Sequence, residues 1–405
     1  MERMKTLSII VLVLFTFIGN SICQMASSAD SSISFHINEN VKNSDTEYFK
    51  CIQENWVNYL NSNYFVKTDN ELWSYDMFDY PDYGYISLLL RLIEIYRNGG
   101  NIQSTTIAIV PVENDYYLLK TVFTEQLPEN HQMVDIKFII SVYAKKKDQY
   151  FKFYSSTQYH KEICENIKVG NVNYVLHSEH QFSMNDALKM NQFNTEVAEL
   201  FGVEPLSFDY MVANDTRDLS ELLGVNLFSY SYQPVPSGGM TDNYNQLIYA
   251  GNNSEYYPHE VVHLYTNAKY SLQYHPWVDE GIAALLGGST GYDIEWHWEK
   301  LRRFLIENPD YPLEDLSVLE SMIPNGEFMT DFRYAIGALI CQKIIDKEGM
   351  TGIFEALQYG RAEENYFALL KDKLDIERAD FGRYVSAEIL KLTPLTEVEL
   401  EDYKY

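Results

Sequence analysis

Cysteine is scarce in this sequence of 405 residues, which contains only four. So few cysteines exclude a small scaffold held together by disulfides, and their spacing matches no zinc-cysteine motif. A chain of this length can bury a hydrophobic core large enough to be stable without such cross-links. Because hydrophobic residues make up 46% of the sequence and aromatic residues 15%, we expect a globular protein rather than a disordered one.

Basic residues are also in short supply, since 31 Lys and Arg stand against 58 Asp and Glu and the net charge is −27. A surface this acidic repels nucleic acid and anionic membranes, so we expect no nucleic-acid partner. The charge favours solubility and attracts cations, but it does not bear on the fold.

The mature chain has no apolar run long enough to span a membrane. The run Leu7–Ile18 follows a basic start and is typical of a secretory signal peptide. Small residues before Gln24 favour cleavage there, so residues 1–23 would be removed and the protein exported to the periplasm or the extracellular space. Lipid attachment at Cys23 is the alternative, but it calls for a small residue where the bulky Ile22 stands.

The chemistry-bearing feature is the segment His259-Glu260-Val261-Val262-His263. Residues four apart lie on one face of an α-helix, so His259 and His263 can bind the same metal ion. A catalytic zinc takes three protein ligands and keeps one position for water, and Glu260 stands beside the first histidine to accept a proton from that water. Glu280, near the start of a second apolar helix, is the candidate third ligand.

The surroundings of Glu280 favour two helices packed antiparallel around the site. Pro276 suits the first turn of the second helix, and Gly287-Gly288 suits its end. Asp279 is a candidate partner for one of the histidines, or else an acid that favours the helix N-terminus. His177 and His180 are also close together in the sequence, but they lack such a context, and we interpret them as ordinary surface residues.

These residues resemble the gluzincin clan of zinc metallopeptidases, and most closely the aminopeptidase N-related enzymes of the peptidase MA type. In that family the third ligand lies in a Trp-x-x-Glu-Gly-x-Ala setting, which Trp277, Glu280, Gly281 and Ala283 match here. The resemblance implies one zinc ion per chain, bound by His259, His263 and Glu280, with Glu260 as general base and later as proton donor to the leaving amine.

A second part of the resemblance lies downstream, at Tyr334 and Gly337. The family carries a Tyr-x-x-Gly helix whose tyrosine donates a hydrogen bond to the oxyanion, and Tyr334 would take this role. A phenol hydroxyl aimed at developing negative charge lowers the barrier. The alternative is that Tyr334, one of 33 tyrosines, only packs a helix.

A third part lies upstream, where Gly238, Gly239 and Met240 are similar to the substrate-holding Gly-x-Met-Glu-Asn segment of aminopeptidases. Glycines let a substrate backbone approach closely, and an edge strand can pair with an extended peptide. Thr241 stands where the amine-binding glutamate of the family would be, and Asp242 restores an acid only with an insertion. A glycine turn between two strands is the alternative interpretation.

We expect an α+β fold with two domains. An N-terminal α+β domain over residues 24–170 would be a roll of the cystatin or nuclear-transport-factor type, and a gluzincin-like domain would follow over residues 171–405. The second domain would consist of a mixed α/β lobe with the HExxH helix (171–269) and an all-helical lobe (270–405).

The expected elements of the first domain are two helices followed by two strand-like runs, each with a break that suits a hairpin. They are the helices Asp45–Asn61 and Ile86–Arg97 and the runs Ser104–Thr124 and Val134–Thr157.

In the mixed lobe, strands and helices alternate, and the sheet would end at an edge strand around Leu247 that leads to the zinc helix. The strands are Val172–His177, Leu206–Ala213 and Gln246–Ala250, and the helices are Met184–Phe201 and Thr216–Leu223. After the second ligand helix only helical patterns follow, one of them capped by Thr330.

The sequence therefore predicts an exported zinc metallopeptidase acting on a peptide or protein. Two alternatives stay open. One is a gluzincin-like zinc hydrolase of a non-peptide substrate, and the other is a noncatalytic binding protein that contains zinc or no metal. The sequence does not indicate an oligomeric state.

Overall fold

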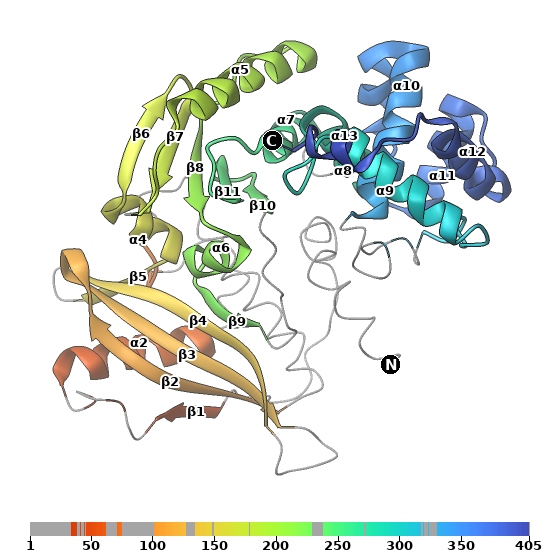
Figure 1. Ribbon diagram of the computed structural model, residues 1–405. Coiled ribbons are helices and arrows are strands. Elements are labelled where there is room, and N and C mark those ends of the chain that lie inside the picture. Colours follow the sequence, from red (N-terminus) through yellow and green to blue (C-terminus); the bar gives the residue numbers. More distant parts are fainter. Residues whose placement is uncertain are drawn as a thin grey trace.

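The computed structural model describes residues 34–38, 41, 44, 46–61, 71–74, 101–126, 134–147, 150–177, 179–228, 238–270, 273–316, 319, 323 and 330–404. It shows the expected α+β protein, with two sheets followed in the chain by helices (Figure 1). The predicted signal peptide and the predicted helix Ile86–Arg97 lie outside the described residues, so both stay predictions.

The first sheet has six strands in the order β1-β2-β3-β4-β5, with β9 paired to β4. The strands are β1 Ser34–Ile37, β2 Asn101–Pro111, β3 Tyr116–Gln126, β4 Val134–Lys147, β5 Tyr150–Tyr154 and β9 Val225–Phe228. The expected hairpin break after β2 is a short turn in which Asn114 and Asp115 have positive φ, a conformation that short polar side chains tolerate. One helix, α2 Glu47–Asn61, buries Phe49, Ile52 and Trp56 in the same core as this sheet.

One expected boundary in this part of the chain is wrong. The predicted strand-like run to Thr157 ends at Tyr154, and helix α4 Ser156–Ile163 begins there. Ser155 and Gln158 form a capping box, in which each side chain bonds the backbone N–H of the other residue. The Ser-x-x-Gln spacing is a helix-start signal that outweighs the aromatic strand pattern before it.

The second sheet has five strands in the order β10-β11-β8-β7-β6. They are β6 Glu165–Val169, β7 Val172–Leu176, β8 Phe208–Ala213, β10 Gly239–Asp242 and β11 Leu247–Gly251. The three inner strands are parallel, and both outer strands are antiparallel to their neighbours. The expected strand around Leu247 is present as β11, but its expected position at the edge is wrong, because β10 pairs with β11 and takes the edge position.

The three inner strands of the second sheet are buried on both faces, which explains their apolar sequences. Tyr174, Tyr210 and Ile248 point into the core shared with helix α5 Met184–Phe201 and the C-terminal helices. Their neighbours in the strands, such as Met211 and Tyr249, point into the core of the first sheet. The β6–β7 hairpin spans the expected domain boundary at residue 170, and β9, after helix α6 Thr216–Leu222, returns to the first sheet.

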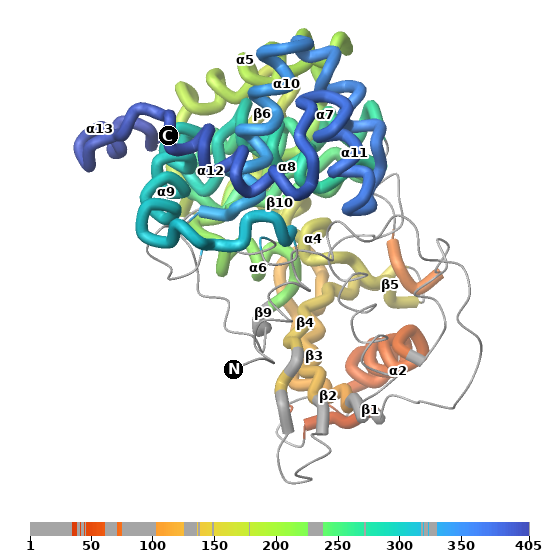
Figure 2. The backbone as a smooth tube through the Cα atoms, turned by 90° about the vertical axis from the view of Figure 1, so that its right-hand side faces the viewer, coloured from red at the N-terminus to blue at the C-terminus, as the bar shows by residue number. Residues whose placement is uncertain are grey.

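The C-terminal part is helical, as expected (Figure 1). Its helices are α7 Pro258–Tyr270, α8 Pro276–Gly287, α9 Ile294–Glu307, α10 Phe332–Ala356, α11 Glu363–Leu374, α12 Phe381–Lys391 and α13 Glu397–Glu401. Figure 2 shows them gathered at one end of the molecule, with the first sheet and α2 at the other. None of the described helices is long and apolar enough to cross a membrane.

One cap and the state of the cysteines correct or extend the sequence analysis. Asp331 rather than Thr330 caps α10, because the Asp331 carboxylate accepts the backbone N–H of Arg333. Cys51, Cys164 and Cys341 are free thiols, so no disulfide joins the described parts of the chain.

Candidate metal centre

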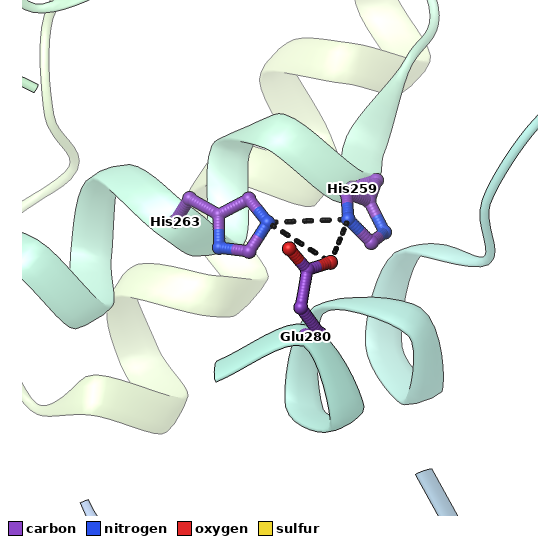
Figure 3. Close-up of side chains that lie close together, drawn as sticks. All are labelled: His259, His263 and Glu280. Atoms are coloured by element: carbon purple, nitrogen blue, oxygen red, sulfur yellow. Dashed lines mark hydrogen bonds and ion pairs between the residues drawn. The ribbon is translucent and has the colours of Figure 1, made fainter. Parts of the chain in front are cut away.

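Helices α7 and α8 bring the three predicted ligands together (Figure 3). His259 Nε2 lies 3.1 Å from His263 Nε2 and 3.4 Å from Glu280 Oε2, and His263 Nε2 lies 3.8 Å from the same oxygen. Ligands of a tetrahedral zinc ion at bond lengths of about 2 Å are about 3.3 Å apart. Among the described residues, no other group of three His, Cys, Asp or Glu side chains converges in this way.

The second ring nitrogen of each histidine also lies close to an oxygen atom. His259 Nδ1 is 2.7 Å from the carbonyl oxygen of Gly288, to which it can only donate. His263 Nδ1 is 3.0 Å from Asp279 Oδ2, and Thr266 donates to the other oxygen of that carboxylate at 2.6 Å. When each ring is neutral and its proton is on Nδ1, both Nε2 atoms carry lone pairs, and these face each other and the Glu280 carboxylate. Such a donor set fits a divalent cation.

The electrostatics of the site agree with this fit. Burial opposes ionisation of Glu280, but His259 and His263 outweigh it and lower its pKa to about 2. Burial likewise disfavours the charged form of His263, yet the carboxylates of Asp279, Glu280 and Glu260 raise its pKa to about 10. The carboxylates thus favour a cation between these side chains, and a zinc ion would take the place of the proton that His263 otherwise binds.

Glu260 lies beside this site and is buried, with 6% of its surface exposed. Thr241 on β10 donates a hydrogen bond to Glu260 Oε2 at 2.7 Å. A Cβ on Gly239, two residues earlier in the strand, would come within 2.8 Å of Glu260 Cγ and 2.4 Å of the Tyr257 ring. The predicted general base is therefore fixed between its own helix and the edge strand.

Tyr334, at the start of α10, is close to the ligands. Its ring lies edge-on to the His259 ring, with centroids 5.5 Å apart. Burial and the nearby Glu280 carboxylate raise the pKa of Tyr334 well above its usual value. The phenol therefore keeps its proton and can act as a hydrogen-bond donor.

Two glycines set the distance between the helices that carry Glu280 and Tyr334. A Cβ on Gly281 would lie 2.4 Å from the backbone carbon of Gly337, and a Cβ on Gly337 would lie 2.6 Å from the Trp277 carbonyl oxygen. Only glycine allows this approach of α8 and α10. The Glu-Gly and Tyr-x-x-Gly patterns thus have a packing reason, whatever the chemistry.

The predicted substrate-binding residues Gly238, Gly239 and Met240 lie at the start of the edge strand β10. Gly251 N donates to Gly238 O at 2.7 Å, so the residues paired with β11 through hydrogen bonds are Gly238, Met240 and Asp242. Gly239 and Thr241 consequently turn their N–H and C=O groups away from β11, towards the side of β10 on which no described strand pairs with it. The strand has the groups that an extended peptide could pair with.

Asp242 does not supply the acid that Thr241 lacks. Its carboxylate accepts hydrogen bonds from the backbone of Tyr244 and Asn245 and from the Asn245 side chain, at 2.8–3.2 Å. These bonds close the turn between β10 and β11, so the side chain is committed to the turn.

The interpretation of His180 as a surface residue is wrong. Its side chain is 2% exposed, and Nε2 lies 2.5 Å from Glu255, whose side chain is 1% exposed. His180 Nδ1 lies 2.9 Å from Asn253 Oδ1. The pair joins the loop after β7 to the loop before α7. It could not be predicted, because the two residues are 75 positions apart in the sequence. His177 Nε2 is buried as well.

Sequence reasoning also missed three groups that act on the site. The Gly288 carbonyl holds His259, the Thr241 hydroxyl holds Glu260, and the buried Arg333 is electrostatically coupled to Glu280 while its guanidinium pairs with Asp331 at 3.0 Å. Of these, only Arg333 carried a sequence signal, as a charged residue beside Tyr334 in an apolar helix.

No protein-family model matches the chain, and no curated protein matches its sequence. The solved structures that match include the M1 zinc metallopeptidase of Deinococcus radiodurans. A mutant of that enzyme bound to a Tyr-Ser-Ala substrate matches with a TM-score of 0.30 and 13% sequence identity. The match covers 73% of this chain and 66% of the Deinococcus chain. Another structure of the enzyme has a TM-score of 0.29 and 12% identity over the same shares. The match spans slightly less than two thirds of the Deinococcus chain and is too distant to decide function.

Proposed function

We propose that this protein is a zinc-dependent metallopeptidase that hydrolyses bonds in a peptide or protein substrate. His259, His263 and Glu280 would hold one zinc ion. When bound, zinc supplies Lewis-acid chemistry, which makes water a stronger acid and withdraws charge from a carbonyl oxygen. The supporting observation is the convergence of three ligand atoms whose histidines are both fixed by a second contact.

The residues of the chain would divide the remaining work between them. Glu260 would accept the proton of the attacking water and pass it to the departing nitrogen. The Tyr334 hydroxyl would donate to the oxyanion. The open edge of β10, at Gly239 and Thr241, would pair with the substrate backbone and hold it extended.

The first test is the metal content of the purified protein, measured by elemental analysis beside the variant His263→Ala. We expect close to one zinc per chain in the parent and a loss of most of it in the variant. A folded parent that takes up no zinc even when zinc is supplied would overturn the proposal and favour the noncatalytic alternative.

The second test is turnover of a peptide library by the zinc-loaded parent and by Glu260→Gln. We expect the variant to keep its zinc and its melting temperature but to lose turnover by at least about a hundredfold, because it lacks the base. Unchanged turnover in this variant would exclude the mechanism. A zinc-loaded parent without any peptide turnover would favour the non-peptide hydrolase.

Export through the predicted signal peptide is part of the proposal. Processing before Gln24 is its test, and N-terminal sequencing of the protein recovered outside the cytoplasm would show it.

A further inference from the structure

The edge strand β10 contacts the candidate site through one polar side chain. Side chains of alternate residues in a strand lie on the same face, and on β10 the face that meets α7 carries Gly239 and Thr241. At Gly239 the missing side chain leaves room for Glu260 Cγ and the Tyr257 ring. At Thr241 the hydroxyl reaches the end of the Glu260 side chain.

The Thr241 hydroxyl has two oxygen atoms of Glu260 within reach. One is carboxylate Oε2 at 2.7 Å, and the other is the backbone carbonyl oxygen at 3.0 Å. A hydroxyl carries a single proton, and a hydrogen bond to an ionised carboxylate is the stronger of the two. The proton therefore goes mainly to Oε2, and that oxygen is fixed relative to β10.

The hydrogen bond from Thr241 restricts a side chain that could otherwise rotate. A glutamate side chain has three rotatable bonds, and only a few of its rotamers place the carboxylate beside the two ligand histidines. Gly239 limits the position of Cγ by close packing, and Thr241 limits the position of the carboxylate by a hydrogen bond.

We propose that Thr241 is a positioning residue, which holds the Glu260 carboxylate in the place where it accepts the proton of the attacking water. The inference rests on the proposed function of Glu260 and adds a residue to it. Because Thr241 acts through Glu260, its loss changes the rate of the chemical step rather than the binding of substrate or zinc.

The experiment compares Thr241→Val, which keeps the shape and removes the hydroxyl, with Thr241→Ser, which keeps the hydroxyl. For Thr241→Val we expect kcat to fall about 10- to 100-fold, as for a misplaced catalytic group, with KM within about twofold of the parent. Zinc content stays the same. Thr241→Ser restores kcat to within a fewfold of the parent. Thr195→Val on α5, whose hydroxyl only bonds the Asn191 carbonyl, is the matched control and leaves kcat unchanged.

A second readout does not depend on turnover. Crystal structures of the zinc-loaded parent and of Thr241→Val should show the Glu260 carboxylate in a single position in the parent and displaced or in several positions in the variant. The proposal is overturned if the carboxylate stays in place, or if the parent turns over peptides and kcat of Thr241→Val equals that of the parent. A parent without peptide turnover contradicts the proposed function alone, and the pair of crystal structures still decides the role of Thr241.

Discussion

At the scale of single residues, the direction of a ligand histidine depends on its second ring nitrogen. Asp279 holds His263 through Nδ1 and is itself held by Thr266. We expect Asp279→Asn to weaken zinc binding by about 10- to 100-fold, because the ring loses the charge that fixes its tautomer and raises its basicity. The dissociation constant, measured by competition with a chelator, checks this.

Thr266→Val is the graded control for that measurement, since it leaves the carboxylate in place and removes one of its hydrogen bonds. Its zinc affinity should fall less than that of Asp279→Asn. Equal affinities in the parent and in Asp279→Asn would show that the contact has no role in metal binding.

The proximity of the two histidines could be predicted from the sequence, because helical spacing places His259 and His263 on one face, and the setting of Glu280 indicated that it joins them. Asp279 could be named only as a candidate partner, since its other role, an acid near a helix N-terminus, has the same sequence signal. The partner of His259 could not be predicted at all. It is the backbone carbonyl of Gly288, and a carbonyl leaves no trace in the sequence.

At the scale of elements, the crossing of α8 and α10 has no room for a side chain. We expect Gly337→Ala to destabilise the protein by about 1–3 kcal/mol, since its Cβ would meet the Trp277 carbonyl oxygen at 2.6 Å. To relieve this contact, α8 must move away from α10. We expect that movement to carry Glu280 away from the histidines and to lower the zinc affinity. Thermal unfolding and zinc titration measure the two effects.

Gly382→Ala in α12 is the control for this substitution. Its Cβ would have neighbours at 3.2–3.4 Å, and the helix gains from losing a glycine. Its stability should therefore change little and its zinc affinity not at all. A similar loss in both variants would mean that the α8–α10 crossing is not special.

The edge strand β10 makes a separate prediction about substrates. Thr241 is neutral and bonded to Glu260, and Asp242 is bonded within its own turn, so neither residue offers a free carboxylate to the amino group of a substrate. We therefore expect a peptide with an acetylated N-terminus to be cleaved with kcat/KM within about threefold of the same peptide with a free amine. If a buried carboxylate did bind the amino group, its loss on acetylation would lower kcat/KM by more than about threefold. A strong preference for the free amine would contradict this prediction and would mean that another acidic residue binds the amino group.

The sequence predicted this segment only in part. The glycines indicated a close approach, and the structure shows that Gly239 makes room for Glu260 and Tyr257. The order of the strands could not be predicted, because β10 is short and its antiparallel pairing with β11 depends on the turn at Asp242–Gln246 rather than on its own residues. For the same reason the sequence pattern placed β11, and not β10, at the edge of the sheet.

At the scale of the whole molecule, the helical part encloses two neutral histidines whose titration links its stability to pH. Burial lowers the pKa of His275 to about 3 and that of His297 to about 4. His275 Nδ1 accepts the Trp277 N–H at the start of α8, and His297 lies between Thr330 and the Ser289 carbonyl. Burial and these contacts therefore favour the neutral form of both rings in the folded state.

The sign of the resulting pH dependence follows from where the proton is bound. Below the usual histidine pKa of about 6.5, His275 and His297 bind protons in the unfolded chain but not in the folded chain. The stability that these rings contribute is therefore complete above about pH 6.5, falls as the pH is lowered, and is lost for His297 near pH 4 and for His275 near pH 3. Within this window each ring adds about 1.4 kcal/mol per pH unit to the slope.

His275→Asn separates one ring from the rest, because asparagine is a good N-cap and does not titrate. In zinc-free protein we expect the free energy of unfolding, from denaturant titrations between pH 6 and pH 4, to fall less steeply in the variant by about 1.4 kcal/mol per pH unit. The absence of zinc excludes acid release of the metal as the cause of the slope. Parallel curves for the parent and the variant would mean that His275 is protonated in the folded state, and the helix α8 that carries Glu280 would then have to start without this cap.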